Sequence, residues 1–184
     1  MPETLFPDEL YDLGKKLVAT ATAQNAIIAT AESCTGGLLA GLITEISGAS
    51  QILQCGFVTY QCEAKQRMLG VDADLIAAKG AVSSEVAAAM ALGALRQSTA
   101  EIAVSITGLA SAGGEHSPTK PVGLVYIGLA CRKNGNNLDQ NGTIALDRVE
   151  QHQFIGNRVQ IRLACVRQAL LILMSALVQP PKDA

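Results

Sequence analysis

The stretch AIIATAESCTGGLLAGLITEI, residues 26–46, passes from an apolar run to a helix-like stripe through a short polar turn. The run Ala26–Thr30 is short, apolar and partly β-branched, which predicts a buried strand. From Gly36 to Ile46 the large apolar residues recur at helical spacing, which predicts a helix. A carboxylate, several hydroxyls, a thiol and two glycines lie between them. The stretch therefore predicts a strand–turn–helix unit with reactive groups at its turn.

The rest of the chain continues this alternation of strands and helices. Apolar spacing and end signals predict helices over Asp8 to about Gln24, Glu63–Leu69, Ser83 or Ser84 to about Leu95, and Val159–Leu177, and strands over Gln51–Tyr60, Ile102–Ile106, Val122–Ala130 and Thr143–Phe154. The turn residues Asn134–Asn137 predict a hairpin before the last strand. We therefore expect an α/β fold, a three-layer α/β/α sandwich with a mostly parallel sheet and antiparallel edge strands. The length of 184 residues predicts a single domain over residues 1–184, with a core from about 8 to 177.

Composition excludes several classes of protein. The chain is 49% apolar and 16% charged with a net charge of −2, which excludes a disordered chain and predicts no nucleic-acid partner. Its five cysteines are scattered without a C-x-x-C pair, which favours free thiols in a reducing cytoplasm. The start of the chain, Met1–Asp12, lacks a signal peptide, and the densest apolar stretch, Ala169–Val178, is too short to span a bilayer. We expect a cytoplasmic protein with no membrane partner.

The turn after the first strand is the first candidate site. Ligands of open α/β sheets bind beyond the carboxyl ends of the strands, where this turn is predicted to lie. The free N–H groups of a helix starting at Gly36 would stabilise an anion, either a phosphate or an oxyanion, and Gly36 and Gly37 allow a ligand close to the backbone. Ser33 or Cys34 would then be placed as a nucleophile. The structural alternative is that Ser33 or Thr35 caps the helix and Cys34 packs as a small apolar residue.

A serine nucleophile needs a base, and the sequence offers three candidates. His116 lies in a glycine-rich loop, whereas His152 lies in a predicted strand among polar residues, which indicates a surface position. Lys65 falls in the first turn of a short helix, where the helix dipole disfavours the charged amine and lowers the lysine pKa. Tyr60 precedes that helix and could relay a proton or donate to an oxyanion. The alternative reading makes Lys65 an ordinary surface lysine.

A third polar segment, SITGLASAGGEHSPTKPVG, spans residues 105–123. Thr107 and Gly108 stand where the chain leaves an apolar strand, Gly113 and Gly114 add flexibility, and Lys120 could contact a phosphate. The segment matches no established phosphate-binding motif, but it is placed as a substrate loop. No cluster of histidine, cysteine and carboxylate side chains has the spacing of metal ligands, so we expect neither a metal nor another cofactor.

Taken together, the motifs resemble the CinA C-terminal family over roughly residues 8–177. The matching motifs, in order, are AESCTGG, GFVTYxxEAKxxxLGV, GAVS, SITGxA, KPVGxVY and FxGNRxxIR. The resemblance implies hydrolysis of nicotinamide mononucleotide to nicotinate mononucleotide and ammonia, a step of NAD recycling. Longer members of the family carry a separate N-terminal domain, which we do not expect in this chain of 184 residues.

Residue by residue, the resemblance implies that Ser33 is the nucleophile, Lys65 the general base and Tyr60 an assisting hydroxyl. The implied substrate-binding residues are Thr35, Gly36, Gly37, Thr107, Gly108 and Arg158. Sequence leaves open whether the amides of the turn hold the oxyanion or the phosphate. The expected partner is a small nucleotide, and the apolar composition favours a homo-oligomer.

Two departures from the family pattern keep other readings open. Many members have Ser-Asn where this chain has Gln61-Cys62, and many read A-G-P-x-G where Ala110 is followed by Ser111-Ala112. The alternative function is a non-catalytic nucleotide-binding or regulatory domain. A third reading makes Cys34 the nucleophile, activated by the helix dipole.

Overall fold

The computed structural model describes residues 5–112, 117, 119–133 and 143–178. Its elements follow the predicted alternation, and their bounds are α1 Asp8–Gln24, β1 Ile28–Glu32, α2 Leu38–Glu45, a 3₁₀ turn Ala49–Gln51, β2 Leu53–Val58, α3 Cys62–Leu69, α4 Ala73–Lys79, α5 Ser84–Arg96, β3 Ile102–Gly108, β4 Leu124–Lys133, β5 Thr143–Gln153 and α6 Arg158–Val178. Every predicted helix and strand is present, with ends shifted by a few residues.

The strands form one mixed sheet in the order β2-β1-β3-β4-β5. Strand β1 pairs in parallel with β2 and β3, whereas β3 with β4 and β4 with β5 are antiparallel. The predicted α/β class and the antiparallel edge are confirmed. The parallel part is smaller than predicted, because the long strands β4 and β5 make half of the pairings among the described strands. The predicted hairpin turn, Asn134–Asn137, lies outside the described residues.

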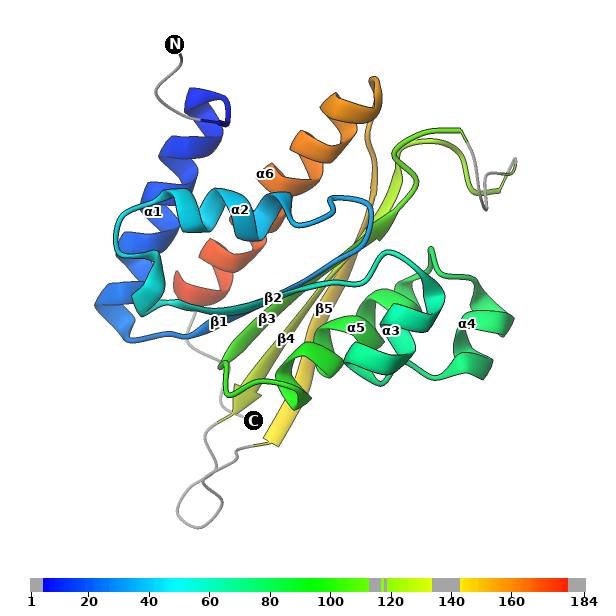
Figure 1. The fold of residues 1–184 in the computed structure, drawn as a ribbon, viewed down its shortest axis with the longest axis horizontal. Helices are drawn as coiled ribbons and strands as arrows, with labels where there is room; N and C mark the ends of the chain where they lie inside the picture. The colour runs from blue at the N-terminus through cyan, green and yellow to red at the C-terminus, as the bar shows by residue number, and fades with distance from the viewer. Residues whose placement is uncertain (1–4, 113–116, 118, 134–142, 179–184) are drawn as a thin grey trace.

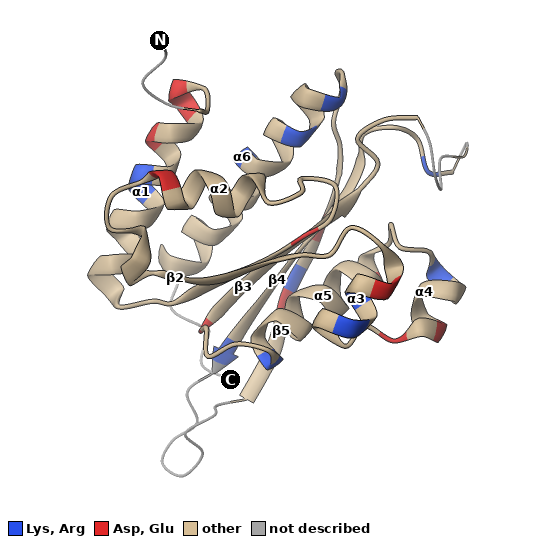
Figure 2. Cartoon of the chain, in the orientation of Figure 1, with Lys and Arg blue, Asp and Glu red and all other residues tan. Residues whose placement is uncertain are grey.

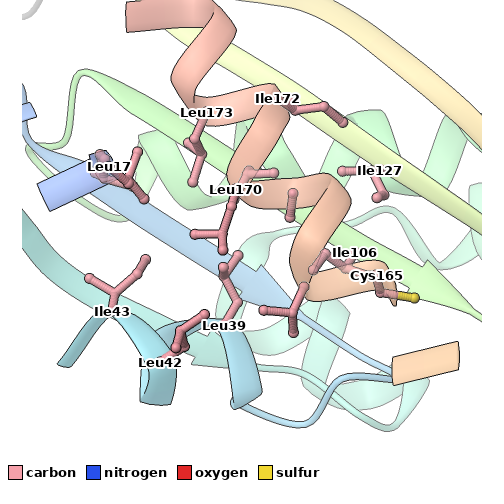
Figure 3. Close-up of a cluster of buried hydrophobic side chains, with 14 of the residues drawn as sticks. Leu17, Leu39, Leu42, Ile43, Ile106, Ile127, Cys165, Leu170, Ile172 and Leu173 are labelled. Carbon is pink, nitrogen blue, oxygen red and sulfur yellow. The ribbon is translucent and has the colours of Figure 1, made fainter. Parts of the chain in front are cut away.

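Helices cover both faces of the sheet (Figure 1). On one face α1, α2 and α6 pack on one another, and their apolar side chains share a buried cluster with β3 and β4. Figure 3 shows this cluster, with Leu39 and Leu42 of α2 facing Leu170 of α6 beside Ile106 of β3. On the other face α5 packs against β3, β4 and β5, and α3 and α4 pack on α5. The sheet is thus covered on both faces, and the turn after β1 and the loop after β3 lie at the carboxyl ends of its parallel strands.

Helix α6 has the length and composition of a membrane-spanning helix, with a mean hydropathy of 1.8. It extends well beyond the apolar stretch 169–178 that sequence analysis considered too short for a bilayer. In the structure 44% of its most apolar window is buried, and Cys165, Leu170 and Leu173 are fully buried in the core. The apolar side of α6 is therefore used in packing against the sheet and its neighbouring helices.

The main local difference from the prediction is at the start of α2. The helix begins at Leu38 and not at Gly36, because Gly36 and Gly37 adopt left-handed conformations with φ of 62° and 92°. Glycine reaches this region without the steric cost that a β-carbon adds. The two glycines therefore belong to the turn, which is longer than predicted.

Two further differences concern α4 and α5. Helix α4 was not predicted; it is short, and its start is capped by the Asp72 carboxylate, which accepts the Asp74 N–H at 2.8 Å. Of the two serines considered as the cap of α5, Ser83 fills that role, since its Oγ accepts the Val86 N–H. Both caps satisfy N–H groups that have no partner within the first turn of a helix.

Candidate active site

The carboxyl ends of three neighbouring parallel strands meet at the site. Glu32, the last residue of β1, is paired with Val58 of β2 on one side and Ile106 of β3 on the other. The residues that follow each strand are therefore brought together, as predicted for the turn after β1 and the loop after β3. Two backbone bonds tie the three ends, from Ser33 N to Ile106 O and from Thr59 N to Glu32 O.

Ser33 and Lys65 are in direct contact. The Lys65 amine nitrogen, Nζ, lies 2.9 Å from Ser33 Oγ and donates to the Thr59 and Tyr60 carbonyl oxygens at 2.8 and 3.3 Å. Ser33 is 8% exposed and Lys65 only 1% exposed, so the surface-lysine alternative is wrong. Glu63, in the same first turn of α3, faces solvent. The structure thus buries an amine against a serine hydroxyl, the arrangement needed for proton transfer between them.

Glu32, which was not predicted as a site residue, holds the start of α2. Its buried carboxylate accepts the N–H groups of Gly37, Leu39 and Ala40 at 3.0, 3.1 and 2.9 Å. These are the amides that the sequence analysis offered to an oxyanion or a phosphate. Because a protein carboxylate already occupies them, an anionic group of a ligand must find other donors. A carboxylate shortly before a helix start was the available sequence signal.

Arg162, on the second turn of α6, was also missed. Its Nε donates to the Cys34 carbonyl at 3.1 Å and its Nη2 to the Thr35 carbonyl at 2.6 Å. Thr35 is fully buried, and its hydroxyl has no hydrogen-bond partner in the described part of the chain. The FxGNRxxIR motif contained Arg162, but nothing in the sequence placed its side chain against the turn.

Arg158 and Tyr60 meet at the exposed rim of the site. Arg158 Nη2 donates to Tyr60 Oη at 3.0 Å, and Nη1 donates to Ser111 Oγ at 2.8 Å. Figure 2 shows basic residues on the first turns of α6, where Arg158 and Arg162 lie. The Tyr60 hydroxyl is therefore held by a cation, while the Tyr60 carbonyl contacts Lys65. Ser111, one of the departures from the family pattern, is part of this contact.

Thr107 and Gly108 end β3 beside the site, but the structure gives both of them packing roles. The buried Thr107 hydroxyl donates to the Ala81 carbonyl at 2.8 Å, which ties β3 to the segment before α5. A β-carbon at Gly108 would lie 2.7 Å from the Leu124 carbonyl, so β4 occupies that side of the glycine. The Thr107 hydroxyl and the space beside Gly108 are therefore already used by the protein itself.

The Cys34 thiol points into the core. Cys34 and Cys165 are both buried in the cluster under α6. A hydrogen bond with Cys165 lowers the pKa of the Cys34 thiol, and the same bond together with burial raises the pKa of the Cys165 thiol. Both thiols lie inside the apolar cluster, whereas Ser33 faces the amine of Lys65. This geometry favours the serine as nucleophile.

The histidines offer no base to Ser33 in the described residues. His152, in β5, is only partly buried, stacks on Phe154 at 5.3 Å and lies 3.1 Å from a Glu150 carboxylate oxygen. His116, with Gly113 and Gly114, lies outside the described residues. Among residues 5–112, 117, 119–133 and 143–178, no group of three or more histidine, cysteine and carboxylate side chains is gathered as metal ligands.

Replacing Glu32 with alanine is expected to lower the free energy of unfolding by about 3 kcal/mol. The substitution leaves three N–H groups at the start of α2 without their acceptor, and each unpaired buried donor carries a desolvation cost. Urea unfolding measures the change. The exposed Glu63→Ala is the control and should shift the free energy by less than about 0.5 kcal/mol. Equal effects of the two variants would show that Glu32 does not hold the turn.

The chain matches the family model of the CinA C-terminal domain over residues 10–177. It is 46% identical to a CinA-like protein of Chlorobium phaeovibrioides over 154 residues, which is 84% of this chain and 34% of that protein. It is 40% identical to a CinA-like protein of Anaeromyxobacter over 175 residues, 95% of this chain and 40% of that protein. The chain thus spans less than half the length of these curated relatives.

Solved structures of similar length share the fold. The competence/damage inducible protein CihA from Agrobacterium tumefaciens superposes with a TM-score of 0.84 at 41% identity, covering 96% of this chain and 99% of that one. A CinA superfamily protein from Klebsiella pneumoniae superposes with a TM-score of 0.80 at 28% identity, covering 92% and 98%. With a family match that includes almost all of the described fold and the Ser33–Lys65 pair, the chain belongs to the CinA C-terminal domain family.

Proposed function

We propose that this domain is an amidase that hydrolyses the carboxamide of nicotinamide mononucleotide to nicotinate mononucleotide and ammonia. The observation that carries the proposal is the 2.9 Å contact between Lys65 Nζ and Ser33 Oγ in a buried setting. A buried lysine beside a serine is the nucleophile and base pair of serine–lysine hydrolases. The choice of substrate rests on the family resemblance of the motifs that carry this pair.

The proposed reaction passes through an ester of Ser33. The neutral Lys65 amine takes the hydroxyl proton while Oγ attacks the carboxamide carbon. The tetrahedral oxyanion collapses, the C–N bond breaks, and the Lys65 ammonium gives its proton to the departing ammonia. Water then attacks the ester carbon, with Lys65 accepting its proton and returning it to Ser33 as the ester bond breaks. The reaction consumes one amide and one water, and it restores both residues.

The exposed rim supports a phosphorylated substrate. The described contacts of Arg158 are the neutral hydroxyls of Tyr60 and Ser111, and no carboxylate pairs with it in the described residues. A guanidinium without a carboxylate partner binds phosphate through two parallel hydrogen bonds. We assign the phosphate of the nucleotide to Arg158 and the carboxamide to the buried pair below it.

The proposal extends to the setting of the reaction. The substrate is a small nucleotide, the protein acts in the cytoplasm as part of NAD recycling, and it works as a homo-oligomer without a metal or organic cofactor. The free cysteines and the apolar composition support this setting.

Incubation of the purified protein with nicotinamide mononucleotide should release ammonia, and a chelator should not stop the release. Ammonia and nicotinate mononucleotide are measured side by side, with and without dialysis against EDTA. Nicotinamide riboside, which lacks the phosphate, is the matched control and should be a poor substrate. Activity lost on dialysis and restored by zinc would overturn the metal-free mechanism.

A wild type that binds the nucleotide but releases no ammonia would favour the non-catalytic, nucleotide-binding function. Equilibrium dialysis of nicotinamide mononucleotide against the protein separates this outcome from simple loss of binding. The sequence features that favour this second function are Gln61-Cys62 and Ser111-Ala112, where the chain departs from the family pattern.

A further inference from the structure

The side chain of Arg162 donates its hydrogen bonds to the backbone of the turn that carries Ser33. One guanidinium binds two consecutive carbonyl oxygens, with Nε donating to Cys34 O at 3.1 Å and Nη2 donating to Thr35 O at 2.6 Å. The forked, planar guanidinium fixes the directions of both carbonyls, which a lysine could not do. The orientation of two peptide planes next to Ser33 is therefore set from α6.

Fixing a carbonyl also fixes the N–H on the other side of the same peptide. In a trans peptide the C=O and N–H bonds point in opposite directions. The peptide whose carbonyl is Cys34 O carries the N–H of Thr35, and the next peptide carries the N–H of Gly36. The Gly36 N–H donates to Ser33 O at 3.0 Å, whereas the Thr35 N–H has no acceptor among the described residues. Arg162 thus presents one free amide on the side of the turn away from α6.

The donors at the start of α2 are already in use, which leaves the N–H groups of Cys34 and Thr35 without an acceptor among the described residues of the turn. Glu32 binds the N–H groups of Gly37, Leu39 and Ala40, so the start of α2 is closed to a ligand. The Thr35 hydroxyl, in a residue that is 0% exposed, also lacks a partner within the described part of the chain. A buried hydroxyl without a partner is costly, and a ligand group that binds to it removes that cost.

The positive charge of Arg162 also strengthens the Thr35 N–H as a hydrogen-bond donor to an anion. Arg148 and Arg167 are paired with carboxylates, at 2.9 Å from Glu150 and 2.7 Å from Glu9, but no carboxylate pairs with Arg162 in the described residues. A positive charge bound to two carbonyls polarises their peptides and makes the opposite N–H a better donor to an anion. The guanidinium also packs directly against Gly36, where a β-carbon would lie 3.4 Å from Nη2.

We infer that Arg162 is a positioning residue that directs the Thr35 N–H, which lies next to the unpaired Thr35 hydroxyl, at the oxyanion formed when Ser33 attacks the amide. This inference rests on the proposed function, and it moves the oxyanion-binding groups from the start of α2 to Thr35. The guanidinium does not touch the substrate. Its loss should lower kcat with little effect on KM, because the oxyanion exists only in the transition state and the tetrahedral intermediate.

The test compares Arg162→Gln and Arg162→Lys with Arg167→Gln, a control on the same helix whose salt bridge to Glu9 is exposed. In the hydrolysis of nicotinamide mononucleotide, Arg162→Gln should lower kcat by about 10²-fold and leave KM within about threefold. Arg162→Lys should lose nearly as much, because one ammonium cannot orient both carbonyls, and Arg167→Gln should match the wild type. The folded fraction of each variant, measured by thermal unfolding, normalises the rates.

A fluorophosphonate probe tests the same point without the substrate. It reacts with an activated serine through a pentacoordinate state whose oxygen needs the same donors, so Arg162→Gln should slow the labelling of Ser33 by a similar factor. Wild-type labelling without amide hydrolysis would overturn the proposed substrate but leave the inference standing. Labelling of folded Arg162→Gln at the wild-type rate would overturn the inference alone. A wild type that neither labels nor hydrolyses would overturn both.

Discussion

Replacing Ser33 with alanine is expected to lower the kcat of amide hydrolysis by roughly four to six orders of magnitude while the fold survives. The substitution removes the oxygen that lies 2.9 Å from the Lys65 amine and no other group of the site. The turn should keep its shape, because its backbone is held by Glu32 and Arg162. Steady-state ammonia release measures the loss, and thermal unfolding checks that the variant is folded.

Cys34→Ala is the matched control for this prediction. Its thiol lies in the buried cluster with Cys165, so the variant should keep most of its activity and lose only some stability from the small cavity. An inactive Cys34→Ala together with an active Ser33→Ala would reverse the assignment and support a thiol mechanism.

Replacing Lys65 with arginine is expected to lower kcat/KM by about 10³-fold. A general base contributes on the order of 10²–10⁴ in rate, and an arginine keeps the charge but does not lose its proton near neutral pH. Because Lys65 is only 1% exposed, Lys65→Met serves as a second variant, unbranched, uncharged and similar in length. Both variants should lose activity, and the Met variant should stay folded. An active Lys65→Arg variant would show that Lys65 supplies only a positive charge and is not the base.

The dependence of the wild-type kcat/KM on pH also tests whether Lys65 acts as a base. Lys65 works as a base only when neutral, so kcat/KM should rise with pH and level off above the lysine pKa. Burial disfavours the ammonium, whereas the carbonyl oxygens of Thr59 and Tyr60 favour it. The midpoint of the rise in kcat/KM measures the balance of these two effects in the free enzyme. A rate that falls as pH rises through this range would contradict a neutral lysine base.

The sequence predicted the elements that place the nucleophile and its base. Apolar periodicity located β1, β2 and β3, and the rule for parallel sheets put the residues after them at one edge. The pairing of Ser33 with Lys65, which are 32 residues apart, came from the family resemblance, because spacing alone cannot show which of two helix ends faces which turn. The structure shows in addition that Lys65 is buried and that its Nζ is hydrogen-bonded to Ser33 Oγ.

The sequence held a weak signal for Glu32, a carboxylate shortly before a helix start, and none for the contacts of Arg162. Only the fold shows that the Glu32 carboxylate accepts three N–H groups of α2 and its preceding turn. An arginine on a helix is read as a surface cation, and only the packing of α6 places Arg162 against the turn. The later start of α2 was predictable in principle, since Gly36-Gly37 disfavours a helix.

The most direct test of the proposed mechanism is to map the covalent intermediate. The wild type is mixed with excess nicotinamide mononucleotide, quenched in acid within the first turnover and digested, and the peptides are analysed by mass spectrometry. The mechanism predicts an added nicotinate mononucleotide acyl group on Ser33, absent from the Ser33→Ala variant. An adduct on Cys34, or ammonia release at the wild-type rate from Ser33→Ala, would contradict it.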